Sequence, residues 1–203
     1  DKGIAKAILL RGTVEAKLKS GEIVSLKRGS WLPEGAVVRT APRSFVKFLF
    51  VDKSQMNLGP KSQMEIEEFP EDEAGVINLV KGKLRSKVTK NYMDMKDKDK
   101  SKLFIKTKTA AMGVRGTDFR VDYNSATQKT ELTTFEGRVA MTKIDERVAS
   151  IKRGAQQQLE KAVSSDKAVM VGRGQAASVL PGRDATAPKE LPESELQQKA
   201  SEP

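Results

Sequence analysis

The most informative segment of the chain reads Thr109-Ala110-Ala111-Met112-Gly113-Val114-Arg115-Gly116-Thr117-Asp118-Phe119-Arg120-Val121. Its two glycines permit a close backbone approach or a positive φ, which other residues resist. After them, the apolar residues Phe119 and Val121 alternate with polar ones, as on a strand with one buried face. The segment therefore predicts a bulged corner between strands, in which Arg115 and Asp118 pair with backbone groups or with each other. Contact with a ligand is the alternative.

The whole of residues 4–142 shows a strand-like pattern. Short apolar runs rich in β-branched residues are bounded by Pro, Gly or Asp-Lys-Ser turns. An apolar–Gly–apolar unit recurs at residues 8–14, 77–84, 134–139 and 170–176. Repeated units of this kind stack to share one core, although any β protein can reuse such turns. We predict an all-β fold of short strands, stacked as a two-layer β-sandwich or a short β-solenoid.

The sequence changes character after this region. Strong helix formers predict one short α-helix near 155–164, and strand-like residues return at 167–180 to close the domain. Residues 1–180 are thus expected to form one domain, with its motifs within 5–142. Pro, Glu, Ala, Ser and Lys dominate 181–203, a composition that predicts a flexible, disordered C-terminal tail.

The composition argues against several classes of enzyme. The chain has no Cys and no His, which removes disulfides, the usual zinc ligands and the side chain that most often transfers protons near neutral pH. The acidic cluster within residues 65–73 lacks the spacing of a calcium-binding loop, and residues 109–121 lack the spacing of a phosphate-binding loop. We therefore expect a non-enzymatic protein with no catalytic residue, no cofactor and no metal.

Basic residues outnumber acidic ones and gather on one predicted sheet face. The formal net charge of +10 favours anionic partners, although it also serves solubility. Cations recur at every second position on two predicted strands, separated by a mixed-charge loop at 93–102. They are Lys81, Lys83, Arg85, Lys87, Lys106 and Lys108. This face is either a solvated surface or a binding surface for a polyanion. Sequence-specific nucleic-acid binding is not expected, because aromatic residues make up only 5% of the chain.

Several of these motifs together resemble the FecR-type domain family. Gly113-Val114-Arg115-Gly116-Thr117-Asp118-Phe119 resembles the hallmark of that family, and Asp52-Lys53-Ser54-Gln55-Met56-Asn57-Leu58-Gly59-Pro60 resembles a second motif. Lys53 stands where the family usually has Gly. Further similarities lie at residues 38–41, 45–48, 79–84 and 135–139. The resemblance covers roughly residues 5–142.

The resemblance implies an extracytoplasmic all-β module of the bacterial cell envelope, in the periplasm or secreted, with its signal peptide removed. It implies a non-enzymatic interaction module that contacts a protein partner or an anionic polysaccharide. The alternative is a sensor component of trans-envelope signalling that regulates a sigma factor, as the best-known members are. Those members carry a cytoplasmic anti-sigma segment and a membrane helix upstream; neither is visible in this sequence, which we expect not to be transmembrane.

Overall fold

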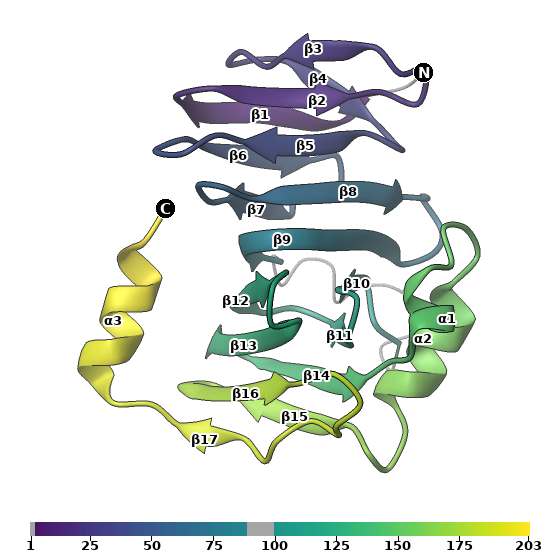
Figure 1. Ribbon diagram of the computed structural model, residues 1–203, viewed down its shortest axis with the longest axis vertical. Helices are drawn as coiled ribbons and strands as arrows, with labels where there is room; N and C mark the ends of the chain where they lie inside the picture. Colours follow the sequence, from purple (N-terminus) through teal and green to yellow (C-terminus); the bar gives the residue numbers. More distant parts are fainter. Residues whose placement is uncertain (1–2, 89–99) are drawn as a thin grey trace.

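The computed structural model describes residues 3–88 and 100–203, and there the chain forms two facing β layers (Figure 1). Most of the predicted 93–102 loop lies outside the described residues. We call the first layer sheet A. Its strands, in spatial order, are β4 (Trp31–Pro33), β1 (Gly3–Arg11), β6 (Phe45–Phe50), β7 (Gln55–Leu58), β9 (Gly75–Lys87), β12 (Asp118–Asn124), β13 (Lys129–Glu136), β16 (Gln175–Val179) and β17 (Lys189–Glu190).

The second layer, sheet B, runs alongside sheet A and shares β9 with it. Its strands, in spatial order, are β3 (Ile23–Ser25), β2 (Val14–Lys17), β5 (Val37–Thr40), β8 (Gln63–Glu68), β9, β10 (Leu103–Lys106), β11 (Ala110–Val114), β14 (Arg138–Lys143) and β15 (Val169–Gly172). The pairings within both layers are antiparallel except for that of β9 with β10, which is parallel. The prediction of short strands stacked in two layers is confirmed.

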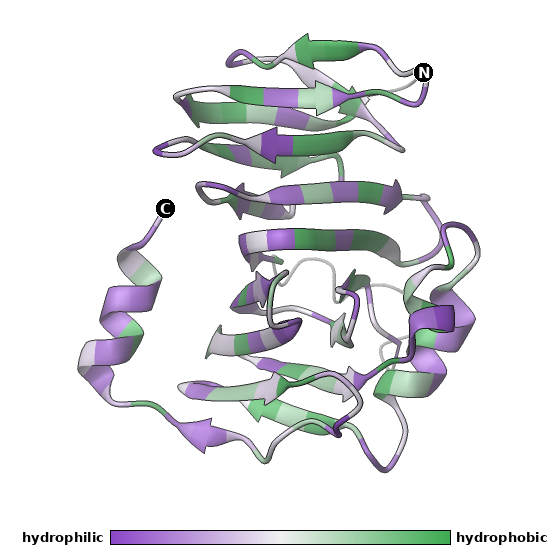
Figure 2. Cartoon of the chain, viewed as in Figure 1, coloured by the Kyte–Doolittle hydropathy of each residue, from purple (hydrophilic) through white to green (hydrophobic). Residues whose placement is uncertain are grey.

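The main core lies between the two layers. In strands such as β2, β6 and β7 every second side chain points inward, which follows from the period of two of extended backbone. β6 shows this as an alternation of half-buried and buried positions, and its buried Phe48 and Phe50 pack edge to face. Hydropathy alternates along these strands in the same way (Figure 2). In β6 and β7 the alternation in the sequence therefore correctly assigns one face of the strand to the core.

Glycines of the recurring sequence unit mark the places where the chain crosses between layers. Gly12 joins β1 to β2, and Gly82 divides β9 into a half in sheet B and a half in sheet A. Both have a positive φ, of 75° and 97°. At each crossing a serine closes the corner: Ser44 Oγ accepts the N–H of Thr13, and Ser62 Oγ accepts that of Lys83. The faint repeat is therefore a repeated corner, which glycine favours because it adopts positive φ without a steric penalty.

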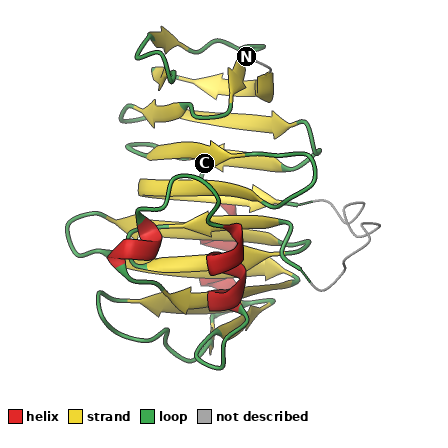
Figure 3. Cartoon of the chain, turned by 90° about the vertical axis from the view of Figure 1, so that its right-hand side faces the viewer, coloured by secondary structure: helices red, strands yellow, loops and turns green. Residues whose placement is uncertain are grey.

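Two helices cover the outer face of sheet B in the later half of the chain (Figure 3). They are α1 (Glu146–Ala149) and α2 (Gln156–Val163). Leu159 and Val163 of α2 pack with Val76, Phe104 and further small apolar residues into a second core. Helix α2 lies within the predicted range 155–164, whereas α1 is an additional turn of helix.

The C-terminal segment differs from the expected disordered tail. It forms β17, which pairs with β16, and then α3 (Glu193–Ser201), which lies along the outer face of sheet A (Figure 1). The composition correctly indicates that this segment buries little, because no residue of α3 is buried. Polar contacts with distant strands hold it instead, and composition carries no signal of those.

Candidate functional site

The segment 113–119 forms the predicted corner. Gly113 and Val114 end β11 in sheet B, and Asp118 begins β12 in sheet A. A Cβ atom on Gly113 would lie 2.7 Å from Ser101 Oγ and 2.9 Å from Val163 Cγ2. Glycine is therefore needed here for helix α2 to pack against the strand.

The second half of the corner packs against another crossing. A Cβ atom on Gly137 would lie 2.9 Å from the carbonyl oxygen of Gly116. Asp118 accepts hydrogen bonds from Nε and Nη2 of Arg85, at 3.1 and 3.0 Å. Arg115 is exposed. These contacts indicate a structural role for the motif. Through Asp118 the motif also holds Arg85.

The six cations of the predicted basic face do not share one surface. Lys83 and Arg85 lie on the outer face of sheet A beneath α3, while Lys87, farther along the same half of β9, is exposed. Lys81 precedes the crossing at Gly82 and belongs to the half of β9 in sheet B. Lys108 is exposed in the turn after β10. The change of layer within β9 breaks the stripe, which the sequence pattern alone does not show.

The prediction that Lys106 lies on an exposed basic face is wrong, because its side chain is fully buried. Its Nζ lies 2.6 Å from Glu67 Oε1 and donates a 2.6 Å hydrogen bond to the carbonyl of Ile151. Lys106 shares its strand face with Phe104, the face that the helical segment covers. Burial raises the pKa of Glu67, and the hydrogen bond and charge of Lys106 offset only part of that rise. The pair attaches the helical segment to sheet B.

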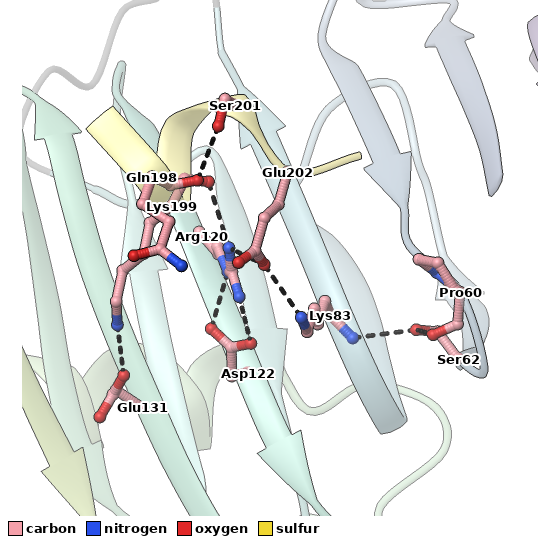
Figure 4. A network of polar contacts seen from close by, with 10 residues as sticks. All are labelled: Pro60, Ser62, Lys83, Arg120, Asp122, Glu131, Gln198, Lys199, Ser201 and Glu202. Carbon is pink, nitrogen blue, oxygen red and sulfur yellow. Dashed lines mark hydrogen bonds and ion pairs between the residues drawn. The ribbon is translucent and has the colours of Figure 1, made fainter. Parts of the chain in front are cut away.

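A polar cluster on the outer face of sheet A receives the end of α3 (Figure 4). We call its sheet residues, Lys83, Arg85, Arg120 and Glu131, the α3-binding face. Arg120 Nη1 donates to the carbonyl of Lys199 at 3.1 Å, and Arg85 Nη1 donates to the carbonyl of Ala200. The last carbonyls of a helix lack partners within it and carry its negative dipole end. The two arginines donate hydrogen bonds to these carbonyls and also place positive charge beside the negative end of the helix dipole.

Charged side chains extend this contact on either side of the helix end. Glu202 Oε2 lies 2.9 Å from Lys83 Nζ and 2.8 Å from Arg120 Nη1, and Lys199 Nζ lies 2.7 Å from Glu131 Oε1. The hydrogen bond from Lys83 and the charge of Arg120 lower the pKa of Glu202. Burial alone would raise the pKa of Glu131, but Lys199, with Lys129 and Arg120, lowers it overall.

A carboxylate of sheet A holds each arginine in place, independently of α3. Arg120, with a side chain only 8% exposed, forms a two-pronged pair with Asp122 at 2.9 Å for both bonds. Arg85 forms the same kind of pair with Asp118, and its guanidinium lies 4.6 Å from the centre of the Phe135 ring. Such paired geometry holds a guanidinium plane rigidly. Sequence reasoning alone did not assign this role to Arg120; the signal that could have shown it is the spacing of Arg120 and Asp122, which lie on one strand face.

A hollow of about 350 Å³ lies beside α3, between Lys199 and the outer-face residues Arg120, Lys129 and Glu131. Its lining mixes both signs of charge. Within residues 3–88 and 100–203, no group of three or more acidic side chains is arranged to hold a metal ion. Across the same described ranges, no helix combines the length and apolar character needed to cross a membrane.

Comparison with known proteins gives one family and one fold. The profile of the FecR protein family matches residues 36–140. No curated protein matches the chain. Two crystal structures of a "putative anti-sigma factor" from Parabacteroides distasonis resemble it, each with 14% identity and a TM-score of 0.55. The similarity covers 81% and 79% of this chain but only 64% and 62% of those chains, so this chain spans less than two thirds of their length. At that identity the likeness concerns the fold.

Proposed function

The chain belongs to the FecR protein family, and from this we propose that it binds a protein partner and serves as a sensor component in signalling across the bacterial cell envelope. The proposal places the β domain in the periplasm or outside the cell. It gives the chain a non-enzymatic role, in line with a sequence that has no His and no Cys. The "putative anti-sigma factor" structures support a link to the control of a sigma factor, through the shared fold.

The observation that carries the binding role is the contact between the α3-binding face and α3. Arg85 and Arg120 are held by carboxylates on their own sheet, yet each still donates to a carbonyl of a segment far away in sequence. Side chains fixed in this way lose little freedom when they bind, which favours recognition. The outer face of sheet A thus already contacts a helical segment of this chain, which supports the proposed binding role.

A protein partner is favoured over an anionic polymer. A linear polyanion needs a continuous row of available cations. Here Lys106 is buried, while Lys83 and Arg85 already contact α3. The remaining cations of the predicted basic face do not form one row, because β9 changes layer at Gly82.

The test has a cellular readout. Cells that produce the wild-type chain are compared with cells that lack it and with cells that produce the Arg85→Gln/Arg120→Gln variant. We expect loss of the chain and the double variant to change the same set of sigma-factor-dependent transcripts, while the control Lys108→Gln behaves as wild type. Transcripts that stay unchanged when the chain is absent would refute the signalling role.

A further inference from the structure

Helix α3 is held by its end and by charge rather than by apolar packing. No residue of α3 is buried, and Leu196, its one large apolar residue, is only partly covered. The contacts that fix α3 are hydrogen bonds and ion pairs at Lys199, Ala200 and Glu202. Partly exposed ion pairs stabilise weakly and are screened by salt. The helix can therefore leave the sheet without opening either core.

The connection between α3 and the domain allows such a movement. The strand before it, β17, is two residues long and pairs with β16 only at Gln175 and Ala176. Pro192 precedes the helix as its N-cap residue and offers no side-chain hydrogen bond to it. With two paired residues in β17 and no side-chain cap on α3, this connection offers little resistance when α3 leaves the sheet, because the ends of strands and helices open at low cost in free energy.

The face beneath α3 has the chemistry of a receptor for one kind of structure, the C-terminal end of a helix. Two successive carbonyls at the end of α3 accept hydrogen bonds from this face: that of Lys199 from Arg120, and that of Ala200 from Arg85. The carboxylate of Glu202 then follows, against Lys83 and Arg120. The cations thus match both the partial negative charge of a helix end and a full negative charge just beyond it.

We infer that α3 is a tethered occupant of a docking site, and that the same site receives a helix end followed by an acidic residue from the protein partner. The inference rests on the proposed function and adds the chemistry of the partner. The partner segment replaces α3 on Arg85 and Arg120 and places a carboxylate between Lys83 and Arg120. Release of α3 then reports that the partner is bound.

The test uses full-length chains and a fluorescently labelled peptide with the sequence of residues 191–203. Gln197→Pro breaks α3 at an exposed position, because proline in a helix interior removes a backbone hydrogen bond and clashes with the preceding turn. In the wild type α3 occupies the site. We expect the peptide to bind the Gln197→Pro chain about 10-fold or more tightly than wild type, since apparent affinity scales with the fraction of open sites.

The site is identified by matched variants in the Gln197→Pro background. Arg85→Gln/Arg120→Gln should abolish peptide binding, whereas Lys108→Gln, an exposed change outside the face, should leave it unchanged. A peptide carrying Glu202→Gln should bind more weakly, and the loss should shrink at high salt. Circular dichroism before each titration confirms that the strands are intact.

Three results would overturn the inference. The first is equal peptide binding by the wild-type and Gln197→Pro chains. The second is peptide binding that survives the loss of both arginines. The third is a wild-type dimer formed by exchange of α3, which would make a second copy the natural occupant. If any of these occurs while loss of the chain still changes the sigma-factor-dependent transcripts, the docking site is ruled out and the signalling role remains.

Discussion

Arg85 and Arg120 lie directly opposite each other on β9 and β12, and each is held by its own aspartate, Asp118 and Asp122. Like charges directly across an antiparallel pair repel and normally destabilise it. Here the two carboxylates offset the repulsion and orient both guanidinium groups toward the end of α3. This arrangement keeps two cations close together on a sheet face.

Arg120→Gln should release α3 while leaving the β layers intact. The change removes the bond to Lys199 and the ion pair with Glu202, contacts to charged or helix-end groups that contribute about 1–3 kcal/mol. In hydrogen exchange, amides of residues 193–201 should lose protection and those of β12 and β13 should keep it. The matched control is Arg28→Gln, an exposed arginine in the loop between β3 and β4. Unchanged protection in α3 would contradict the assignment.

Docking of α3 should weaken in acid. The pKa values of Glu131 and Glu202 are lowered in the folded chain, so each stabilises docking above the ordinary value of 4.5 and loses this effect as the pH falls through its lowered pKa. Titration followed by NMR should show α3 signals moving toward those of a free segment below about pH 4.5. Glu202→Gln should reduce the pH dependence. Glu67, whose pKa is raised, has the opposite sign and favours the folded state at low pH.

Lys106→Met should destabilise the chain by about 3 kcal/mol, because it leaves the carboxylate of Glu67 buried without its closest cation. Lys152 remains 3.4 Å from Glu67 but is 59% exposed, so it compensates only in part. The double variant Lys106→Met/Glu67→Leu should recover most of the loss. Urea unfolding measures both. Lys108→Met is the control and should change the free energy of unfolding by less than about 0.5 kcal/mol.

Lys53→Gly should stabilise the chain by about 0.5–1 kcal/mol, because Lys53 has a φ of 73°, where a side chain is strained. Lys47→Gly, in the middle of β6, should destabilise it by about the same amount. Thermal unfolding of the two variants should move in opposite directions. A loss of stability in Lys53→Gly would mean that contacts of the Lys53 side chain stabilise the fold by more than the strain of its positive φ destabilises it.

Gly82→Ala should damage the crossing within β9 more than conformational strain alone can. A Cβ atom there would lie 2.6 Å from Ser62 Cα, so we expect a loss of about 3 kcal/mol or more. Gly21 has a similar φ of 89° with nothing within 4 Å of the added atom. Gly21→Ala should therefore lose only about 1 kcal/mol, the cost of the backbone conformation. Equal losses in the free energy of unfolding for the two variants would show that Ser62 moves aside without destabilising the fold.

The positions of the corners could be predicted from sequence because their causes are local. Gly82 and Gly113 are required by a positive φ or by a close approach, and both stand within recognisable short patterns. Lys53, at the position where the family usually has Gly, likewise has a positive φ. Only part of the candidate site could be predicted from the sequence. Lys83 and Arg85 stand out there as cations on one strand, but nothing local connects them with Arg120 or with α3.

The sequence by itself determined the alternation within strands, the glycine turns and the family, since a period of two and a positive φ involve only neighbouring residues. Only the tertiary structure decided which charges are available. Lys106 became buried because a helical segment 45 positions later in the chain covers it, and Arg85 acquired a partner 115 positions away. Burial and pairing of a charge depend on what packs against it in space, and spacing along the chain does not record that.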